Sequence, residues 1–336
     1  MAILIDPPAW PAHGTLWSHL VSDASADELH AFARLMGFPR RSFDLDHYDV
    51  SAANYDRAVA LGAQPVAGRE VVRRLQLAGL RVRQVDRERV TPVRRRQYLA
   101  EQWAALGAAL GTSLGAGGEN SSTPPEGAGA ARGRAWRELG EELIARWNEP
   151  HRSYHDERHL EDVLLALDHL ESRGERIAPE TLLAAWFHDA VYAGSAGDDE
   201  RASAALAVAA LTRLGCDREL IDAVAASIIA TTPGLAPAEP RPALAQLLDA
   251  DLWIFASSRS RYAEYAAAVR REYAHVPAEE FAAARTGILA GYLDRPALYA
   301  TEAARHLWER RARANVSAEI ERLREWARES ARDAPR

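Results

Sequence analysis

Over the first hundred residues, segments with the apolar spacing of strands alternate with segments that have the apolar spacing of helices. Short apolar or alternating runs over residues 1–5 and 80–85 are typical of strands, and the first run ends at Asp6. Because strand and helix patterns interleave, the sequence predicts a small α/β domain over residues 1–108. Its helices are expected where apolar positions recur at helical spacing, over residues 25–36, 51–61 and 70–77.

From residue 134 onward the pattern is helical throughout, with glycine and proline residues where helices are expected to end. This pattern predicts an all-α bundle over residues 134–330. The preceding residues 109–133 are rich in Gly, Ser, Pro and Ala, so we expect a flexible linker there. The expected helices of the bundle span residues 136–147, 155–170, 180–191, 199–214, 219–230, 243–256, 261–273, 278–293 and 298–327.

The strongest chemical signal is an apolar run over residues 184–187 that stops at His188 and Asp189. An imidazole and a carboxylate on the inner face of a helix are costly to bury unless a cation or another partner satisfies them. Adjacent residues on an ideal helix point about 100° apart, so both side chains can face inward only near a helix end. Gly194 and Gly197 support an ending there.

Further metal-ligand candidates lie on other predicted helices, His159 upstream and an aspartate downstream. Asp249 and Asp251 cannot share one helical face at a spacing of two residues. Asp251 lies beside Leu248 and Leu252 on the apolar stripe, so we prefer it as the inward-facing residue.

The order of these residues on a helical segment resembles the HD superfamily of metal-dependent phosphohydrolases. The resemblance covers residues 135–325 and is closest to a bacterial branch of predicted HD phosphohydrolases. It implies an all-α HD-type bundle that cleaves a phosphomonoester, of a nucleotide or another small phosphorylated metabolite, through a metal-activated water. Besides the ligands, it is carried by Tyr154-His155, Trp-Phe-His-Asp-Ala-Val-Tyr at 186–192, Asp-Glu-Arg-Ala-Ser-Ala at 199–204, Asp-Ala-Asp-Leu at 249–252 and Arg-Arg-Glu-Tyr-Ala-His-Val-Pro at 270–277.

By this resemblance His159, His188, Asp189 and Asp251 are the metal ligands. Binuclear HD enzymes carry further histidines between the HD pair and the last aspartate, whereas residues 190–250 contain none. We therefore expect one divalent ion per chain, and an iron-dependent HD-type oxidase is disfavoured. The mixed nitrogen and oxygen ligands suit Mn²⁺, Co²⁺, Fe²⁺, Ni²⁺, Zn²⁺ or Mg²⁺ without selecting among them.

Hydrolysis also requires a general acid or base near the attacking water. Glu200 is the first candidate for this role, with Asp199 behind it. The alternative is purely structural, because Asp198 or Asp199 would suit a helix N-cap. The two interpretations are compatible if one acid caps the helix while Glu200 faces the site.

Substrate-binding candidates are the residues beside the proposed ligands. His155 shares a helix face with His159 at a spacing of four residues, and it can bind phosphate, orient a ligand or act as a further ligand. Tyr154, Arg158 and Tyr192 are the other candidates, although each alone is more often a surface or packing residue.

Composition narrows the function further. The net charge of −7 and a pI near 5.9 argue against nucleic acid as a partner. Cys216 is the single cysteine, and there is no signal peptide or membrane-length apolar run, so we expect a cytoplasmic protein. Tyrosines at helical spacing over residues 262–273 indicate either core packing or a homodimer surface.

The N-terminal domain, which resembles a small bacterial domain family of unknown function, has polar candidates of its own: Asp6, His19, His47 and Asp49. With Arg40 and Arg41 beside them, these residues would suit a metal or phosphate site. No metal-type spacing links them, and we favour a structural interpretation in which Asp6 caps a turn, His19 packs on a helix, and His47 and Asp49 satisfy loop backbone.

Two functions of different class follow from the sequence. The first is the metal-dependent phosphohydrolase. The second is a non-catalytic sensor that binds a nucleotide or metal and signals through the N-terminal domain. Loss of a metal ligand would favour the sensor, and the sequence retains all four candidates.

Overall fold

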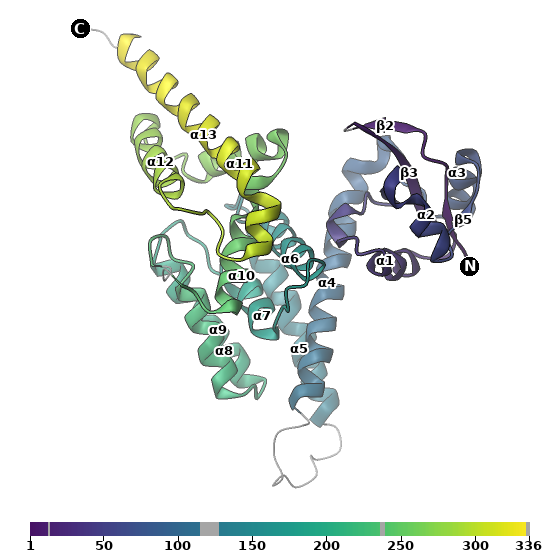
Figure 1. Ribbon diagram of the computed structural model, residues 1–336. Helices are drawn as coiled ribbons and strands as arrows, with labels where there is room; N and C mark the ends of the chain where they lie inside the picture. The colour runs from purple at the N-terminus through teal and green to yellow at the C-terminus, as the bar shows by residue number, and fades with distance from the viewer. Residues whose placement is uncertain (13, 115–127, 236–238, 334–336) are drawn as a thin grey trace. The chain divides into compact units, whose positions relative to one another are not determined.

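The computed structural model describes residues 1–12, 14–114, 128–235 and 239–333. The chain divides into two compact units (Figure 1). One comprises Met1–Tyr98 with Glu171–Glu175, and the other comprises Leu99–Leu170 with Arg176–Arg336. The prediction of a small α/β region followed by a helical region is confirmed.

The N-terminal unit is built on a five-stranded sheet in the order β2-β3-β1-β5, with β4 paired to β3. The pairing of β1 with β3 is antiparallel, and that of β1 with β5 is parallel. Ile5, Leu20 and Val50 lie with Leu29 of the first helix in one buried cluster. The strands are β1 (Ile3–Ile5), β2 (Trp10–Ala12), β3 (Thr15–Ser22), β4 (Tyr48–Ser51) and β5 (Gln64–Pro65), and the helices are α1 (Ala26–Leu35), α2 (Ala52–Ala60) and α3 (Gly68–Leu77).

The strand predicted over residues 80–85 is wrong. This segment is irregular and leads into a short 3₁₀ turn, Gln84–Asp86. Val82 is buried, but its backbone N–H donates to the Asp46 carboxylate instead of to a neighbouring strand. The segment is therefore a largely exposed loop in which Val82 alone is buried and the Asp46 side chain holds the backbone in place.

The described part of the C-terminal unit is helical and contains no strand. Along the chain, α8 packs on α9, and α12 packs on the long α13. A short 3₁₀ segment interrupts the helix predicted over residues 243–256. The elements are α4 (Arg87–Leu114), α5 (Ala128–Arg146), α6 (Glu157–Glu171), α7 (Pro179–Phe187), α8 (Asp198–Arg213), α9 (Arg218–Ile229), α10 (Pro242–Asp251), η3 (Leu252–Ala256), α11 (Arg259–Glu272), α12 (Ala278–Leu293) and α13 (Glu302–Asp333).

The predicted linker, residues 109–133, has helix at both ends. Helix α4 continues to Leu114 and α5 begins at Ala128, while residues 115–127 lie outside the described residues. Trp103, Leu106 and Leu110 of α4 are buried. These side chains belong to the helical unit, which begins at Leu99. None of the described helices combines the length and apolarity needed to cross a membrane.

Candidate metal centre and pocket

Three segments of the helical unit bring the four predicted ligands together. Asp156 accepts the backbone N–H groups of Arg158 and His159, which places His159 in the first turn of α6. His188 is the C-cap of α7, and Asp189 follows outside the helix. Asp251 is the last residue of α10. The expectation that the His188–Asp189 pair sits at a helix end is confirmed, because α7 ends at Phe187 and not at the predicted residue 191.

The ligand atoms of these residues are close to one another. His159 Nε2 lies 3.2 Å from both His188 Nε2 and Asp251 Oδ1. Asp189 Oδ2 lies 3.3 Å from His188 Nε2 and 3.7 Å from His159 Nε2. Nitrogen and oxygen ligands about 2.0–2.2 Å from one ion lie roughly 3.0–3.5 Å apart. The distances between the two imidazoles, and from the imidazoles to each carboxylate, therefore fit ligands of a single ion, and His159, His188 and Asp189 have ligand atoms that all lie within 4.8 Å of one another.

The two imidazoles are held so that Nε2 faces this cluster. His188 Nδ1 lies 2.9 Å from the Ala185 carbonyl, which fixes the ring and leaves Nε2 as the ligand atom. His159 Nδ1 is buried and has no hydrogen-bond partner among the described residues. The ring of Trp147 packs 5.5 Å from His188 and 6.0 Å from His159, so the inner side of the cluster is apolar.

The electrostatics of the cluster favour a cation. Burial alone lowers the pKa of His188, but the Asp189 and Asp251 carboxylates overcome this effect and raise that pKa well above its usual value. Burial has the opposite effect on a carboxyl group and raises the pKa of Asp189, but the His188 imidazole outweighs burial and lowers that pKa to about 2. The carboxylates thus stay ionised and attract positive charge, which a metal ion or protons on the imidazoles can supply.

Asp249 occupies a different environment from Asp251. Its carboxylate accepts the backbone N–H groups of Ala300 and Thr301 at 2.6 and 2.7 Å, ahead of α13. Burial is the main influence on Asp249 and raises its pKa to about 6. The structure therefore brings Asp251 to the histidines and uses Asp249 to fix the start of α13.

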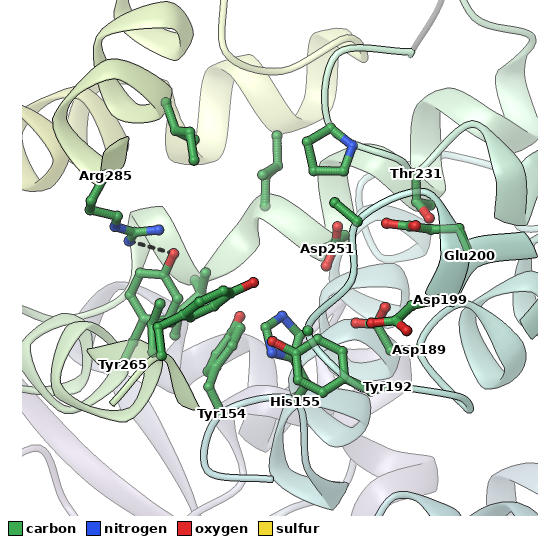
Figure 2. A pocket seen from close by; sticks show the side chains of 18 of the residues that line it. Tyr154, His155, Asp189, Tyr192, Asp199, Glu200, Thr231, Asp251, Tyr265 and Arg285 are labelled. Atoms are coloured by element: carbon green, nitrogen blue, oxygen red, sulfur yellow. Dashed lines mark hydrogen bonds between the residues drawn. The ribbon is translucent and has the colours of Figure 1, made fainter. Parts of the chain in front are cut away.

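A pocket of about 430 Å³ opens beside the cluster and is lined by His188, Asp189 and Asp251 (Figure 2). His155 and Tyr192, two of the predicted substrate-binding residues, also line it, and their rings stack at 4.2 Å. Tyr154, the third, is buried against Tyr265 in the pocket wall. Aromatic side chains and the metal-ligand candidates therefore share one cavity.

Glu272, at the end of α11, organises one side of this pocket and is absent from the sequence-based candidates. Its Oε1 accepts the backbone N–H groups of Ser153, Tyr154 and His155 at 2.7–3.0 Å. Its Oε2 accepts from His155 Nδ1 at 2.8 Å and from the Tyr192 hydroxyl at 3.2 Å. Burial opposes ionisation, but these bonds, led by His155, lower the pKa of Glu272 to about 2.

The predicted acid and base residues line the pocket but are engaged in local structure. Asp199 Oδ2 accepts the backbone N–H groups of Ala193 and Ser195. Glu200 Oε2 accepts the N–H of Gly197, which is the N-cap of α8. The N-cap is Gly197 and not Asp198 or Asp199, so the expected aspartate cap is wrong, whereas Glu200 lines the pocket as expected. The Glu200 carboxylate therefore holds the N-cap backbone and also faces the pocket.

Two arginines close in sequence to the proposed metal ligands, Arg152 and Arg158, do not line the pocket. Arg158, predicted to bind substrate, pairs with Glu264 at 3.0 Å on the surface. The Arg152 side chain is fully buried, and it donates to the carbonyls of His155, Asp189 and Ala190. Arg152 therefore ties the loop after the HD pair to the segment before α6.

Arg285 of α12 is the arginine that lines the pocket, and sequence reasoning missed it. Its guanidinium donates to Glu319 Oε1 at 3.0 Å and to the Tyr265 hydroxyl at 2.7 Å. Figure 2 shows Arg285 and Tyr265 on the opposite side of the pocket from Asp199 and Glu200. Tyr262 and Tyr265 are both buried within the unit, so the tyrosine stripe is core and gives no support to a homodimer.

In the N-terminal unit, the second group of candidates also converges. His19 is on strand β3, where its Nδ1 lies 2.9 Å from Asp6 Oδ2, and His47 Nε2 lies 3.5 Å from Asp49 Oδ1. The expectation that His19 packs on a helix is wrong, because His19 lies on β3, where the pairing of β3 with β4 sets it opposite Asp49. Arg40 is elsewhere, over the rings of Phe43 and Tyr98.

Comparison with known families matches residues 3–78 to a model described as a protein of unknown function, DUF4031. The N-terminal unit is thus similar to a domain family of unknown function, as the sequence indicated. No curated protein and no solved structure matches the chain.

Proposed function

We propose that the helical unit is an HD-type, metal-dependent phosphohydrolase acting on a small phosphomonoester. The observation that carries the proposal is the convergence of His159, His188, Asp189 and Asp251 beside a pocket, with each carboxylate 3.3–3.7 Å or 3.2–3.7 Å from the two imidazole Nε2 atoms, which are 3.2 Å apart. Two imidazoles and two carboxylates drawn from separate helices form a donor set that fits one divalent ion.

A divalent ion bound there would polarise a phosphoryl oxygen and lower the pKa of water. The chain itself supplies positive charge for the phosphate at His155. Burial lowers the pKa of His155, but its hydrogen bond to Glu272, together with the charges of Glu272, Asp189 and Asp251, outweighs this and raises it. His155 is therefore positioned to hold the phosphate or to protonate the leaving oxygen.

The remaining pocket wall favours a substrate with a flat or ring-shaped group. Tyr192, Tyr265, Phe255 and Tyr292 line the cavity, and Arg285 lies among them. Aromatic walls bury rings well, and a guanidinium donates hydrogen bonds to carbonyl oxygens on such a ring. A nucleoside monophosphate combines these features, and a sugar phosphate satisfies them in part.

The test is a phosphate-release screen with the full chain. The protein is stripped with a chelator, reloaded with Mn²⁺, Co²⁺ or Mg²⁺, and assayed against nucleoside monophosphates and sugar phosphates, with Asp251→Ala as the inactive control. Metal-dependent release that Asp251→Ala abolishes supports the proposal. Metal binding with no turnover of any phosphomonoester would overturn it and favour the non-catalytic sensor.

A further inference from the structure

The two histidines of the N-terminal unit meet because strands β3 and β4 are neighbours. In their antiparallel register His19 pairs with Asp49, and His47 immediately precedes β4. The rings of His19 and His47 are 5.0 Å apart. One ligand atom from each of His19, His47 and Asp49 lies within 4.8 Å of the others. Two imidazoles and a carboxylate are thus gathered at one point of the sheet.

Each imidazole is oriented by a buried carboxylate on its Nδ1 atom. His19 Nδ1 lies 2.9 Å from Asp6, and His47 Nδ1 lies 2.7 Å from Asp46. Both rings therefore keep Nε2 as the atom available for a ligand bond. Metal-bound histidines in proteins are held by such a carboxylate or carbonyl at their second nitrogen.

The orienting carboxylates are themselves fixed. Asp6 Oδ1 accepts the backbone N–H of His19. Asp46 Oδ2 accepts from Arg81 at 2.8 Å and from the backbone N–H of Val82 at 2.7 Å. Asp6 also lies against the start of α3, where a Cβ on Gly68 would come within 3.2 Å of Oδ2. Both orienting carboxylates are therefore buried and held in place by the fold of the unit.

A pocket of about 460 Å³ adjoins these residues and is lined by Asp6, His19 and His47. Val21, Val71 and Leu75 give it an apolar floor. An ion held by three protein ligands keeps coordination positions for water or a small ligand, and this pocket supplies the space for them.

We infer that His19, His47 and Asp49 form a second metal site, specific for a divalent transition ion such as Zn²⁺, Co²⁺, Ni²⁺ or Fe²⁺. Two imidazoles with one carboxylate suit these ions better than Ca²⁺ or Mg²⁺, which prefer oxygen ligands. Asp6 and Asp46 act as positioning residues. This site belongs to the N-terminal unit and does not rest on the proposed phosphohydrolase activity.

The test uses the full chain in an Asp251→Ala background, so that metal bound to the helical unit does not mask the result. The protein is stripped, reloaded with micromolar Co²⁺ or Zn²⁺ and submitted to elemental analysis. One ion per chain is expected, and Asp49→Asn should abolish it. Asp56→Asn, an exposed aspartate on α2 of the same unit, is the matched control and should retain the ion.

The double variant His19→Ala/His47→Ala provides a second check by removing both imidazoles. If it fails to fold, Asp49→Asn still decides, because the Asp49 side chain is 53% exposed. Asp6→Asn keeps all three ligands and should weaken Co²⁺ binding by about 10- to 100-fold. Absence of metal from the Asp251→Ala protein, or equal metal content in Asp49→Asn and Asp56→Asn, would overturn the inference.

Discussion

The indole rings of Trp103 and Trp136 stack 4.1 Å apart and 7° from parallel, and each indole N–H donates to the backbone carbonyl of the other residue. This reciprocal pair joins α4 to α5. It depends on two glycines, because a Cβ on Gly107 would lie 2.3 Å from the Trp136 ring and one on Gly140 would lie 2.3 Å from the Trp103 ring.

Gly107→Ala and Gly140→Ala are therefore expected to destabilise the protein by about 1–3 kcal/mol each through overpacking. Alanine otherwise favours a helix over glycine by about 1 kcal/mol. The matched controls are Gly111→Ala in α4 and Gly133→Ala in α5, whose Cβ atoms would meet open space, and both should be neutral or stabilising. Urea unfolding measures all four. Equal effects at paired and control positions would contradict this packing role.

The same pair shows why the linker boundary is hard to predict. Gly, Ala and Ser dominate α4 beyond residue 104, and such composition predicts an unstructured segment. Two tryptophans more than thirty residues apart in the sequence instead join this helix to α5, and Leu106 and Leu110 are buried. Because Trp103 and Trp136 are so far apart in the sequence, no local sequence pattern predicts their contact.

Asp251→Ala is expected to abolish metal retention by the helical unit, whereas Asp249→Ala should retain it. Asp251 Oδ1 faces His159 Nε2, while Asp249 accepts backbone N–H groups near α13. Asp249→Ala should instead lower stability by about 1–3 kcal/mol, because it leaves buried donors unsatisfied. Elemental analysis after metal reloading distinguishes Asp251→Ala from Asp249→Ala. Both variants are made in an Asp49→Asn background, so that metal bound to the N-terminal unit is not counted. Full metal occupancy of the helical unit in Asp251→Ala would show that Asp251 is not a metal ligand.

The metal-ligand candidates illustrate what sequence can supply about a site. The abrupt end of an apolar run at His188 predicts a helix end, and the apolar stripe around Asp251 selects it over Asp249. Glu272 and Arg285 carry no such signal. Glu272 contacts backbone groups 117 to 119 residues away, and Arg285 is held by Glu319 on another helix. Only tertiary packing shows these contacts.

Arg285→Met is expected to destabilise the protein by about 3–5 kcal/mol, because it leaves the buried Glu319 carboxylate without a cation and with only the Tyr262 hydroxyl as a donor among the described residues. The double variant Arg285→Met/Glu319→Gln removes both charges and should recover much of this loss. If Arg285 also binds the substrate, the double variant should still show a KM raised at least about tenfold, with a smaller effect on kcat. Thermal unfolding and steady-state kinetics measure the two effects. An unchanged KM would limit Arg285 to a structural role.

Glu272→Gln should produce a pH-dependent loss of stability. The pKa of Glu272 is lowered to about 2, from a reference of 4.5, so its contribution is present above pH 4.5 and is lost as the pH falls towards 2. The pKa of His155 is raised, so its contribution is present below the reference value of 6.5 and is lost as the pH rises through the folded-state pKa. The melting temperatures of wild type and Glu272→Gln should therefore differ most between about pH 4.5 and 6.5.

Two further measurements isolate the His155–Glu272 bond from general destabilisation. The His155 imidazole, followed by NMR, should titrate at lower pH in Glu272→Gln, because an amide oxygen stabilises an imidazolium less than a carboxylate does. Glu264→Gln on the exposed face of α11 is the matched control and should leave that titration unchanged. A melting-temperature difference that is constant with pH, or an unshifted His155, would show that Glu272 acts only through the backbone N–H groups that it accepts.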